Sequence, residues 1–409
     1  MNQSNYKTII KLLSPLACVA FAVMFVASSC DSDEVVTPDP KPTSTNPSIF
    51  IKDKAKYAML HSMRDLDGTG RLYEINYTAD YKLDQVIAAQ AIDQRQLFAY
   101  ISSILFDSIP SSAADVSFGS GCSAFAAPDP DNGNCLMGRN YDFRHFMVHG
   151  TDTSYKETSA IIVHTAPAGR KKSISMVDGL NLNYGRGFYN NDSTDLSLLM
   201  GLPYAALDGI NEDGFAIGIL ALKEKQTRQS TGKTKIGSTV AIRMLLDNAS
   251  DVNSALDLLD DYDMVMEGQG NSNYHFFMAD AKDNYAIVEY TFDKNKGEAT
   301  PHVTAILNNN DTLRCVTNFY VDPIMEGTND GWGSLHGKDR YWTLRGTLAS
   351  NKYKLTDSQA WKLLQDVAQP PTDEFTSQTQ WSALYNLTKK SMRLAILREY
   401  GKEYNFKVK

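Results

Sequence analysis

The chain has 409 residues, of which 43% are hydrophobic and 22% are charged, and its formal net charge is -8. This composition is typical of a globular protein and excludes a collagen-like, disulfide-scaffold or wholly disordered chain. The acidic balance argues against a nucleic-acid partner, because contacts to phosphates need a basic surface. The length allows two or three domains or one large core.

Residues 1–30 have the pattern of a targeting segment rather than of a folded element. Two lysines precede an apolar stretch, residues 12–27, that is shorter than a membrane-spanning helix needs. The stretch ends in Val26-Ala27-Ser28-Ser29-Cys30, which resembles a bacterial lipobox, and in such signals Cys30 becomes the lipidated first residue of the mature chain. The alternatives are an ordinary signal peptide with an incidental cysteine and an uncleaved anchor.

Residues 31–48 are predicted to be a linker between this lipidated cysteine and the folded part. Residues 31–34, DSDE, resemble the acidic export signal of surface lipoproteins in some Gram-negative gut bacteria. Residues 35–48 contain four prolines and few apolar side chains, which predicts an extended, solvated tether. We therefore expect an outer-membrane lipoprotein in the cell envelope of a Gram-negative bacterium, exposed at the surface.

Residues 49–121 are predicted to combine strands and helices. Leu72–Tyr77 alternates like a strand after the turn at 67–70, and Leu83–Leu105 carries apolar residues at helical spacing, which predicts one helix. Residues 107–121 are rich in Ser, Ala, Gly and Pro and are predicted to form an exposed loop.

After Cys122 the pattern changes to short strands joined by tight turns. The predicted strand pairs are 159–165 with 173–177, 274–279 with 286–290, and 381–387 with 392–396. A buried strand is expected at 215–222, two helices within 239–259, and one more helix at 357–367. Many antiparallel hairpins with helices between them predict an α+β layered architecture.

Several common motifs are incomplete or missing. Gly232-Lys233-Thr234 resembles the end of a P-loop, but Thr227 stands where the first glycine is required. The sequence has no HExxH, no CxxC and no clustered histidines, so no metal site is predicted. No serine lies in a GxSxG motif, which excludes the nucleophile elbow of an α/β-hydrolase. We expect no cofactor.

Three cysteines remain for the folded part: Cys122, Cys135 and Cys315. Because three is an odd number, at least one thiol is unpaired. A disulfide between Cys135 and Cys315 and two separate buried thiols are both open interpretations.

Cys122 has the most informative surroundings of the three. It opens an apolar strand directly after the flexible stretch Gly119-Ser120-Gly121, and a second strand returns through the turn at 128–133 with Arg139 and Asp142. A guanidinium near a thiol favours the thiolate, which is the nucleophilic form. The alternative is a buried structural cysteine beside a structural Arg–Asp ion pair.

The stretches Cys122-Ser123 and Gly138-Arg139-Asn140-Tyr141-Asp142 resemble the N-terminal-nucleophile (Ntn) cysteine hydrolases that cleave linear amides. This family includes choloylglycine hydrolase, penicillin V acylase, acid ceramidase and N-acylethanolamine acid amidase. Residues 208–214 (DGINEDG), 316–320 (VTNFY) and 339–341 (DRY) are similar to further motifs of the family, in the family's order. The resemblance implies a four-layer αββα Ntn-hydrolase fold over 122–409, preceded by a helical and β pro-segment at 49–121.

The resemblance also implies a role for each matched residue. Cys122 is the nucleophile, and its freed α-amine is the general base, whose ordinary pKa of about 7.7–8.0 suits that task. Asp142 orients the amine, and Arg139 lies beside the thiolate. Asn318 donates to the oxyanion, a contribution of about 3 kcal/mol for one good donor. Arg340 holds this network together, or is only a structural ion pair outside it.

Two departures from bile salt hydrolases accompany the resemblance. Those enzymes place an asparagine at the end of the strand after the Asn-Glu-x-Gly turn, but the corresponding position here is near Ala221. The long segment before Cys122 is similar to that of acid ceramidase and N-acylethanolamine acid amidase, whose pro-segment is cleaved and stays bound. We therefore expect autocleavage between Gly121 and Cys122, with 31–121 held on 122–409 by the apolar face of the 83–105 helix.

The function expected from these matches is hydrolysis of a linear amide between an apolar acyl chain and a small amine or amino acid. The alternatives within enzymes are deconjugation of bile salts and penicillin V acylase-type activity. The alternative from another class is an inactive, surface-exposed binding lipoprotein, in which the chain stays uncleaved and Cys122 is unreactive.

Overall fold

The computed structural model describes residues 46–108, 121–143, 146–149, 152–222, 226–266, 273–292, 299–303, 313–325, 336–372 and 377–409. All of them lie in the unit that runs from Pro38 to Lys409. The predictions for the leader, for Cys30, for most of the linker and for residues 109–120 lie outside the described residues.

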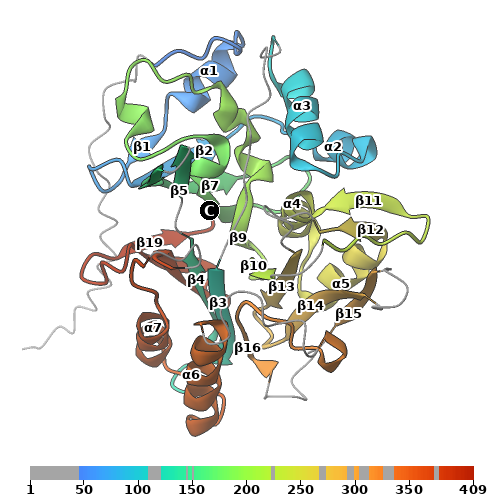
Figure 1. Cartoon of the computed structure of the whole chain (residues 1–409), viewed down its shortest axis with the longest axis vertical. Helices are drawn as coiled ribbons and strands as arrows, with labels where there is room; N and C mark the ends of the chain where they lie inside the picture. The colour runs from blue at the N-terminus through green and yellow to red at the C-terminus, as the bar shows by residue number, and fades with distance from the viewer. Residues whose placement is uncertain are drawn as a thin grey trace, which may run out of the picture. The chain divides into compact units, whose positions relative to one another are not determined.

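A nine-stranded sheet is the larger of two central sheets (Figure 1). Its strands in spatial order are β1 (Arg64–Asp65), β2 (Leu72–Tyr77), β7 (Ala160–Thr165), β8 (Ser173–Asp178), β9 (Ala206–Asn211), β10 (Ala216–Leu222), β13 (Asn273–Ala279), β14 (Tyr285–Phe292) and β15 (Ala299–Val303). Neighbouring strands are antiparallel except β2 and β7, which run parallel. The strands predicted at 159–165, 173–177, 215–222, 274–279 and 286–290 are confirmed within one or two residues at most ends.

A six-stranded antiparallel sheet carries the Cys122 hairpin. Its strands in spatial order are β16 (Cys315–Val316), β3 (Gly121–Pro128), β4 (Cys135–Asp142), β17 (Thr379–Asn386), β18 (Ser391–Ile396) and β19 (Tyr404–Lys407). The predicted hairpin of 381–387 with 392–396 is β17 and β18. The turn before β4 is held by Asp129, whose side chain accepts from the amide of Asp131.

The two sheets face each other across a shared apolar core. Successive side chains of a strand point to opposite faces. Along β3, Cys122, Ala124 and Ala126 therefore pack in the core between the sheets, whereas Phe125 and Ala127 pack into a second cluster with leucines of the C-terminal helices.

Helices cover the outer face of each sheet. Helix α4 (Ser238–Asn248) packs on β9 and β10 of the nine-stranded sheet. On the six-stranded sheet, α6 (His336–Ser350) packs on β3, and α7 (Asp357–Asp366) packs on β4 and β17. The order helix, sheet, sheet, helix is the expected αββα architecture, and the α+β fold class is confirmed.

Residues before Cys122 are part of the same layers. They carry α1 (Lys54–Leu60), α2 (Leu83–Ala89) and α3 (Gln94–Leu105), and their strands β1 and β2 form one edge of the nine-stranded sheet. Smaller elements are α5 (Val252–Asp260), the strand pairs β5 (Phe146–His149) with β6 (Asp152–Tyr155) and β11 (Thr234–Gly237) with β12 (Tyr262–Val265), and the 3-10 helices η1 (Gly179–Leu182), η2 (Phe188–Asn190), η3 (Ser197–Tyr204) and η6 (Pro323–Met325).

The single helix predicted over 83–105 is wrong. The chain forms α2 and α3 instead, because Gln90 adopts a left-handed backbone with φ of 50° that ends the first helix. Asp93 then caps the second helix, and its side chain accepts from the amide of Gln96 at 2.7 Å. The two helices predicted within 239–259 are confirmed as α4 and α5.

The three cysteines of the folded part are all buried, and none of them forms a disulfide. The thiol of Cys135 donates to the carbonyl of Ala281, between the two sheets. Cys315 packs instead with Leu344 and Leu348 on the helix-covered face. The two thiols therefore lie on opposite faces of the six-stranded sheet, and of the two open interpretations the structure contains separate thiols rather than a disulfide.

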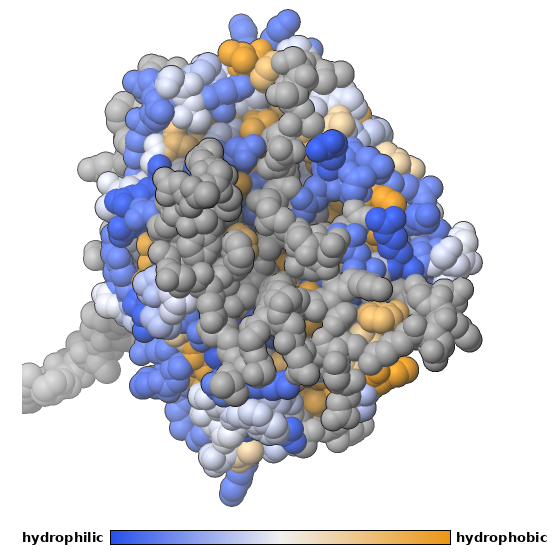
Figure 2. All heavy atoms as spheres, viewed as in Figure 1, coloured by the Kyte–Doolittle hydropathy of each residue, from blue (hydrophilic) through white to orange (hydrophobic). Residues whose placement is uncertain are grey.

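On the face in Figure 2, hydrophilic side chains predominate, and the hydrophobic ones are scattered. Exposed large hydrophobic side chains include Ile49, Tyr57, Ile324 and Trp342. Among the helices that the structure describes, none is long and apolar enough to cross a membrane.

Candidate active site

Cys122 lies at the start of β3, where the six-stranded sheet faces the nine-stranded sheet. It is fully buried, and it pairs in register with Tyr141 of β4. The other two thiols are poor nucleophiles, because burial raises the pKa of Cys315 to about 12 and also raises the pKa of Cys135. Cys122 is therefore the candidate nucleophile among the three.

Arg139 extends from β4 into the space between the sheets. Its guanidinium donates to the carbonyl oxygens of Asn140 at 2.6 Å and of Ile219 at 2.5 Å. It packs directly on Gly218 of β10, where an added Cβ would lie 3.0 Å from the Arg139 Nε atom. This close contact explains why a glycine interrupts an otherwise apolar strand.

The charge on Arg139 is stabilised by its neighbours. Burial acts to lower the pKa of Arg139, but the charges of Cys122 and Asp208 outweigh burial and raise it above its ordinary value. Arg139 therefore remains a cation beside the Cys122 sulfur, and a nearby cation favours the thiolate.

Asp208 is a site residue that the sequence analysis did not assign. It lies on β9, and its carboxylate is 3.6 Å from the Nε atom of Arg139, with both side chains fully buried. Trp381 donates to the same carboxylate at 3.0 Å, and Tyr385 donates to its other oxygen. One signal was available: a carboxylate within the apolar segment 206–210 must be paired when that strand is buried.

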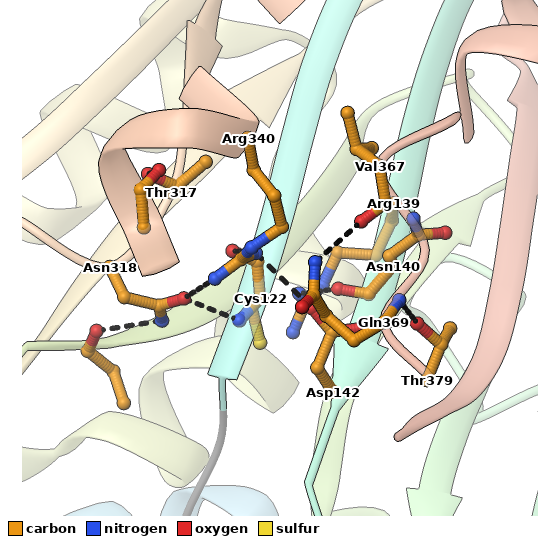
Figure 3. Close-up of polar contacts among 12 residues, drawn as sticks. Cys122, Arg139, Asn140, Asp142, Thr317, Asn318, Arg340, Val367, Gln369 and Thr379 are labelled. Carbon is orange, nitrogen blue, oxygen red and sulfur yellow. Dashed lines mark hydrogen bonds and ion pairs between the residues drawn. The ribbon is translucent and has the colours of Figure 1, made fainter. Parts of the chain in front are cut away.

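Asn318 lies next to the backbone nitrogen of Cys122 (Figure 3). The Cys122 nitrogen donates to Asn318 Oδ1 at 2.7 Å, and the Nδ2 atom of Asn318 donates to the carbonyl of Ala221 at 2.9 Å. The main-chain carbonyl of Ala221 therefore holds the Asn318 amide; because a carbonyl only accepts, it does not supply the donor that is expected from an asparagine near this position.

Arg340 on α6 connects three groups of the site. Its guanidinium donates to the carbonyl of Cys122, to Asn318 Oδ1 at 2.8 Å and to Asp142 Oδ2 at 3.1 Å. Burial lowers the pKa of Arg340 below its ordinary value, although the charges of Asp142 and Cys122 act in the opposite direction. A single planar side chain therefore fixes the positions of the other three.

Asp142, at the end of β4, is held from two sides. It accepts from Arg340, and its other oxygen accepts from the hydroxyl of Thr379 at 2.6 Å. The Thr379 hydroxyl in turn accepts from the amide of Gln369 at 2.7 Å. These contacts orient the carboxylate at the same strand ends where Gly121 pairs with Asp142.

Tyr141 forms a second buried polar chain next to Cys122. Its ring stacks on Trp381 with centroids 4.1 Å apart, and its hydroxyl donates to Asp178 at 2.9 Å. Burial and the Asp178 charge raise the pKa of Tyr141 well above its ordinary value, so it stays a neutral donor. Tyr141 and Asp178 were not assigned from the sequence.

The structure thus brings all five predicted site residues together. Cys122, Arg139 and Asp142 come from the β3–β4 hairpin, Asn318 from the segment after β16, and Arg340 from α6. Asn211, from the motif at 208–214, has a different place: its side chain accepts from the amides of Asp213 and Phe215 and shapes the turn before β10.

The arrangement contains a nucleophile and charge-stabilising groups. Within the described ranges, no group of three or more His, Cys, Asp or Glu side chains is placed to hold a metal ion. Two buried arginines, the carboxylates of Asp142 and Asp208, and the amide of Asn318 form the site around a cysteine whose backbone nitrogen faces an acceptor. This set suits acyl transfer through a thioester.

Comparison with known proteins gives one family match. Residues 195–398 match the model of the acyl-coenzyme A:6-aminopenicillanic acid acyl-transferase family. The matched range includes Asp208, Asn318 and Arg340 and begins after Cys122 and Arg139. No curated protein matches the sequence.

Similar solved structures are remote from this chain. Two variants of conjugated bile acid hydrolase from Clostridium perfringens each have 16% identity and a TM-score of 0.45, over 70% of this chain and 92% of theirs. Penicillin V acylase from Agrobacterium tumefaciens has 15% identity and a TM-score of 0.41, over 67% of this chain and 83% of its own.

Proposed function

Because residues 195–398 match the acyl-coenzyme A:6-aminopenicillanic acid acyl-transferase family and the groups around Cys122 suit acyl transfer, we propose that this chain is an Ntn-type amidase, in which Cys122 is an N-terminal nucleophile that hydrolyses linear N-acyl amides. The substrate joins an apolar acyl chain to a small amine or amino acid. The observation that carries the proposal is the contact of Asn318 Oδ1 with the Cys122 nitrogen at 2.7 Å, because this nitrogen must become the general base.

The reaction begins with cleavage of the chain. The Cys122 sulfur attacks the carbonyl carbon of Gly121, the Gly121–Cys122 C–N bond breaks, and the released nitrogen of Cys122 takes a proton. Water then hydrolyses the thioester, which leaves a carboxylate on Gly121 and a free thiol and α-amine on Cys122. Cleavage comes before amide hydrolysis, because the α-amine that serves as the base does not exist while Cys122 is inside the chain.

In the mature enzyme the same two atoms act on the substrate. The α-amine takes the thiol proton as the sulfur attacks the acyl carbon, and it then gives a proton to the leaving amine. Water resolves the acyl thioester and regenerates the thiol. Arg139 stabilises the thiolate, and Asp142 orients the amine of Cys122. Arg340 holds the Cys122 carbonyl and the Asp142 carboxylate, and Asn318 Nδ2 turns from Ala221 to the oxyanion.

The substrate class is tested by direct comparison of amides. We expect fatty N-acyl amides to be cleaved faster than taurine- or glycine-conjugated bile acids or phenoxyacetyl amides, because the segment before Cys122 is like that of the fatty amidases. If the amine is released faster from conjugated bile acids, the proposed substrate class is wrong and the protein is a bile salt hydrolase. An intact chain with an unreactive Cys122 would replace it by a binding protein.

A second outcome of the same thioester is acyl transfer to an amine. The match of 195–398 to an acyl-transferase family supports including it. The assay therefore contains a free amine as acceptor, and we expect free acid as the main product. A larger yield of transferred amide would assign the protein as an acyltransferase.

The location is a separate proposal that depends on Cys30. The lipobox-like sequence at 26–30 supports a lipid anchor in the outer membrane. We predict that Cys30→Ala moves the protein from the membrane fraction to the soluble fraction, with amidase activity retained. Unchanged fractionation in the variant would contradict lipidation.

A further inference from the structure

A buried histidine–glutamate pair lies under the segment that carries Asn318. His275 on β13 and Glu289 on β14 are register partners, and both side chains are fully buried. The His275 Nδ1 atom lies 3.0 Å from Glu289 Oε1. The mechanism above does not use either residue.

The histidine–glutamate pair forms hydrogen bonds with the chain before and after Asn318. On one side, His275 Nε2 lies 2.8 Å from the carbonyl of Thr317. On the other side, the amides of Val321 and Asp322 donate to the two carboxylate oxygens of Glu289 at 2.9 and 3.0 Å. The residues immediately before and three and four positions after Asn318 are thus tied to one point of the nine-stranded sheet.

The bonding pattern fixes where the protons lie. The Thr317 carbonyl can only accept, so His275 Nε2 carries a proton. An unprotonated Nδ1 atom and a carboxylate oxygen both only accept, so their contact at 3.0 Å places a second proton between Glu289 Oε1 and His275 Nδ1. Each member therefore needs the other, because loss of either leaves a buried polar group unsatisfied.

Two neighbouring hydrogen bonds also hold the segment that carries Asn318. Asn273, two positions before His275 on β13, donates to the hydroxyl of Tyr320 at 2.6 Å. The hydroxyl of Thr317 donates to the carbonyl of Gly337 at the start of α6, the helix of Arg340. The pair therefore links the nine-stranded sheet to the segments that carry Asn318 and Arg340, the two residues that contact Cys122.

We propose that His275 and Glu289 are positioning residues that hold Asn318 against the Cys122 nitrogen. The consequence for catalysis rests on the proposed function, but the structural part does not. If the pair loosens, the Asn318 amide shifts from the Cys122 nitrogen, and a displacement of about 1 Å at a reacting centre costs about 100-fold in rate.

The structural part is tested without any substrate. In a Cys122→Ala background, which keeps the chain uncleaved, hydrogen exchange of the residue 122 amide reports its bond to Asn318. We expect Glu289→Gln to accelerate exchange at 122 and at 320–322 by tenfold or more, on the order of one lost hydrogen bond, while amides of β17 and β18 keep their rates. His275→Gln should give the same pattern.

The chain offers a matched control in the same sheet. His164 on β7 and Glu74 on β2 form a second histidine–glutamate pair, 2.8 Å apart, on strands remote from Asn318 in the sheet order. Glu74→Gln and His164→Gln should leave exchange at residue 122 unchanged. Equal exchange at 122 in the Glu289→Gln and Glu74→Gln variants would overturn the proposal.

The catalytic consequence is measured in the cleavable chain. We expect Glu289→Gln to lower kcat by about ten- to a hundredfold and to change KM by less than about twofold, because the displaced group acts in the transition state. Glu74→Gln should retain the wild-type kcat. Faster exchange at residue 122 with an unchanged kcat would overturn the catalytic consequence of the proposal. A wild-type protein without amidase turnover would contradict the proposed function. In that case the exchange experiment alone would still decide whether His275 and Glu289 position Asn318.

Discussion

Asn318 has two chemical roles in the site, one as a hydrogen-bond acceptor and one as a donor, and substitutions can separate them. Its oxygen accepts from the Cys122 nitrogen and from Arg340, and its nitrogen donates to the Ala221 carbonyl. The family resemblance implies only a donor role toward an oxyanion for this residue. The geometry of the uncleaved chain adds an acceptor role at the nitrogen that becomes the base.

A pair of substitutions separates these two roles. Asn318→Asp keeps an acceptor for Cys122 and Arg340 but removes the donor, so we expect chain cleavage to continue while kcat falls about 100- to 1000-fold. Asn318→Ala removes both and should also slow chain cleavage. Intact mass measures cleavage, and product release measures kcat.

The control for this prediction is Asn351→Asp. Asn351 lies just after α6 and donates to the carbonyl of Thr347, away from Cys122, so its variant should resemble the wild type. An Asn318→Asp enzyme with wild-type kcat would remove Asn318 from the oxyanion site.

The role of Asp208 was not predicted from the sequence, because it depends on a contact between distant parts of the chain. The roles of Cys122, Arg139 and Arg340 follow from local motifs that resemble a family. The contact of Asp208 with Arg139 joins two strands from different sheets, and no local spacing predicts it. Only the presence of a carboxylate in an apolar strand pointed to a buried partner.

At the scale of elements, β10 and β4 touch at Gly218 and Arg139. The short distances from a Cβ at Gly218 to Nε and Cδ of Arg139, 3.0 and 3.1 Å, leave no room for a methyl group. We predict that Gly218→Ala displaces the guanidinium and lowers kcat by about tenfold or more, with a loss of about 1–3 kcal/mol in the free energy of unfolding. Urea titration and product release measure the two effects.

Gly346 on α6 is the matched control for this substitution. It lies within a helix, and an added Cβ there meets nothing within 4 Å. Gly346→Ala should keep the wild-type kcat and stabilise the protein by about 0.5–1 kcal/mol. If Gly218→Ala also keeps the wild-type kcat, Arg139 does not need its present position for activity.

The elements that were predicted well are those with a strong local signal. The β13–β14 and β17–β18 hairpins combine alternating apolar residues with short polar turns, and both form as expected. Helix α6 was not predicted, because few apolar side chains, such as Tyr341, Leu344 and Leu348, mark its buried face among charged and polar residues. The break at Gln90 was missed because no Gly or Pro marks it.

At the scale of the whole molecule, the segment before Cys122 is part of the catalytic layers. Strand β2 pairs with β7 along its whole length, and the hydroxyl of Tyr81 donates to the buried Asp247 at 2.6 Å. Arg243 completes this contact through an ion pair with Asp247 at 2.7 Å. The segment before Cys122 was expected to be held by the apolar face of a helix. In the structure, the β2–β7 pairing and the buried Tyr81–Asp247–Arg243 cluster also hold it on the rest of the chain.

We predict that the two fragments of the cleaved protein stay associated under native conditions. They should elute as one species in size-exclusion chromatography and separate only at urea concentrations that also unfold the sheet, since dissociation would expose the β7 edge. Separation of the fragments in native buffer would contradict the continuous sheet. Uncleaved Cys122→Ala protein is the control for the elution volume.

The class of architecture was predictable at this scale, but the order of the strands was not. Hairpins and interspersed helices are local features and indicate stacked α+β layers. The parallel pairing of β2 with β7 joins strands more than 80 residues apart in the sequence. Pairing between such distant strands depends on tertiary packing, which no local sequence pattern encodes.

The central claim is that Cys122 becomes an N-terminal nucleophile, and its most direct test is N-terminal sequencing of the active enzyme with intact mass. We predict one fragment that begins at Cys122 and ends at Lys409, together with the fragment that ends at Gly121. The acyl thioester should form on the Cys122 fragment, and Cys122→Ala protein should remain one inactive chain. Full amidase activity in a chain that remains uncleaved at Gly121–Cys122 would contradict the account.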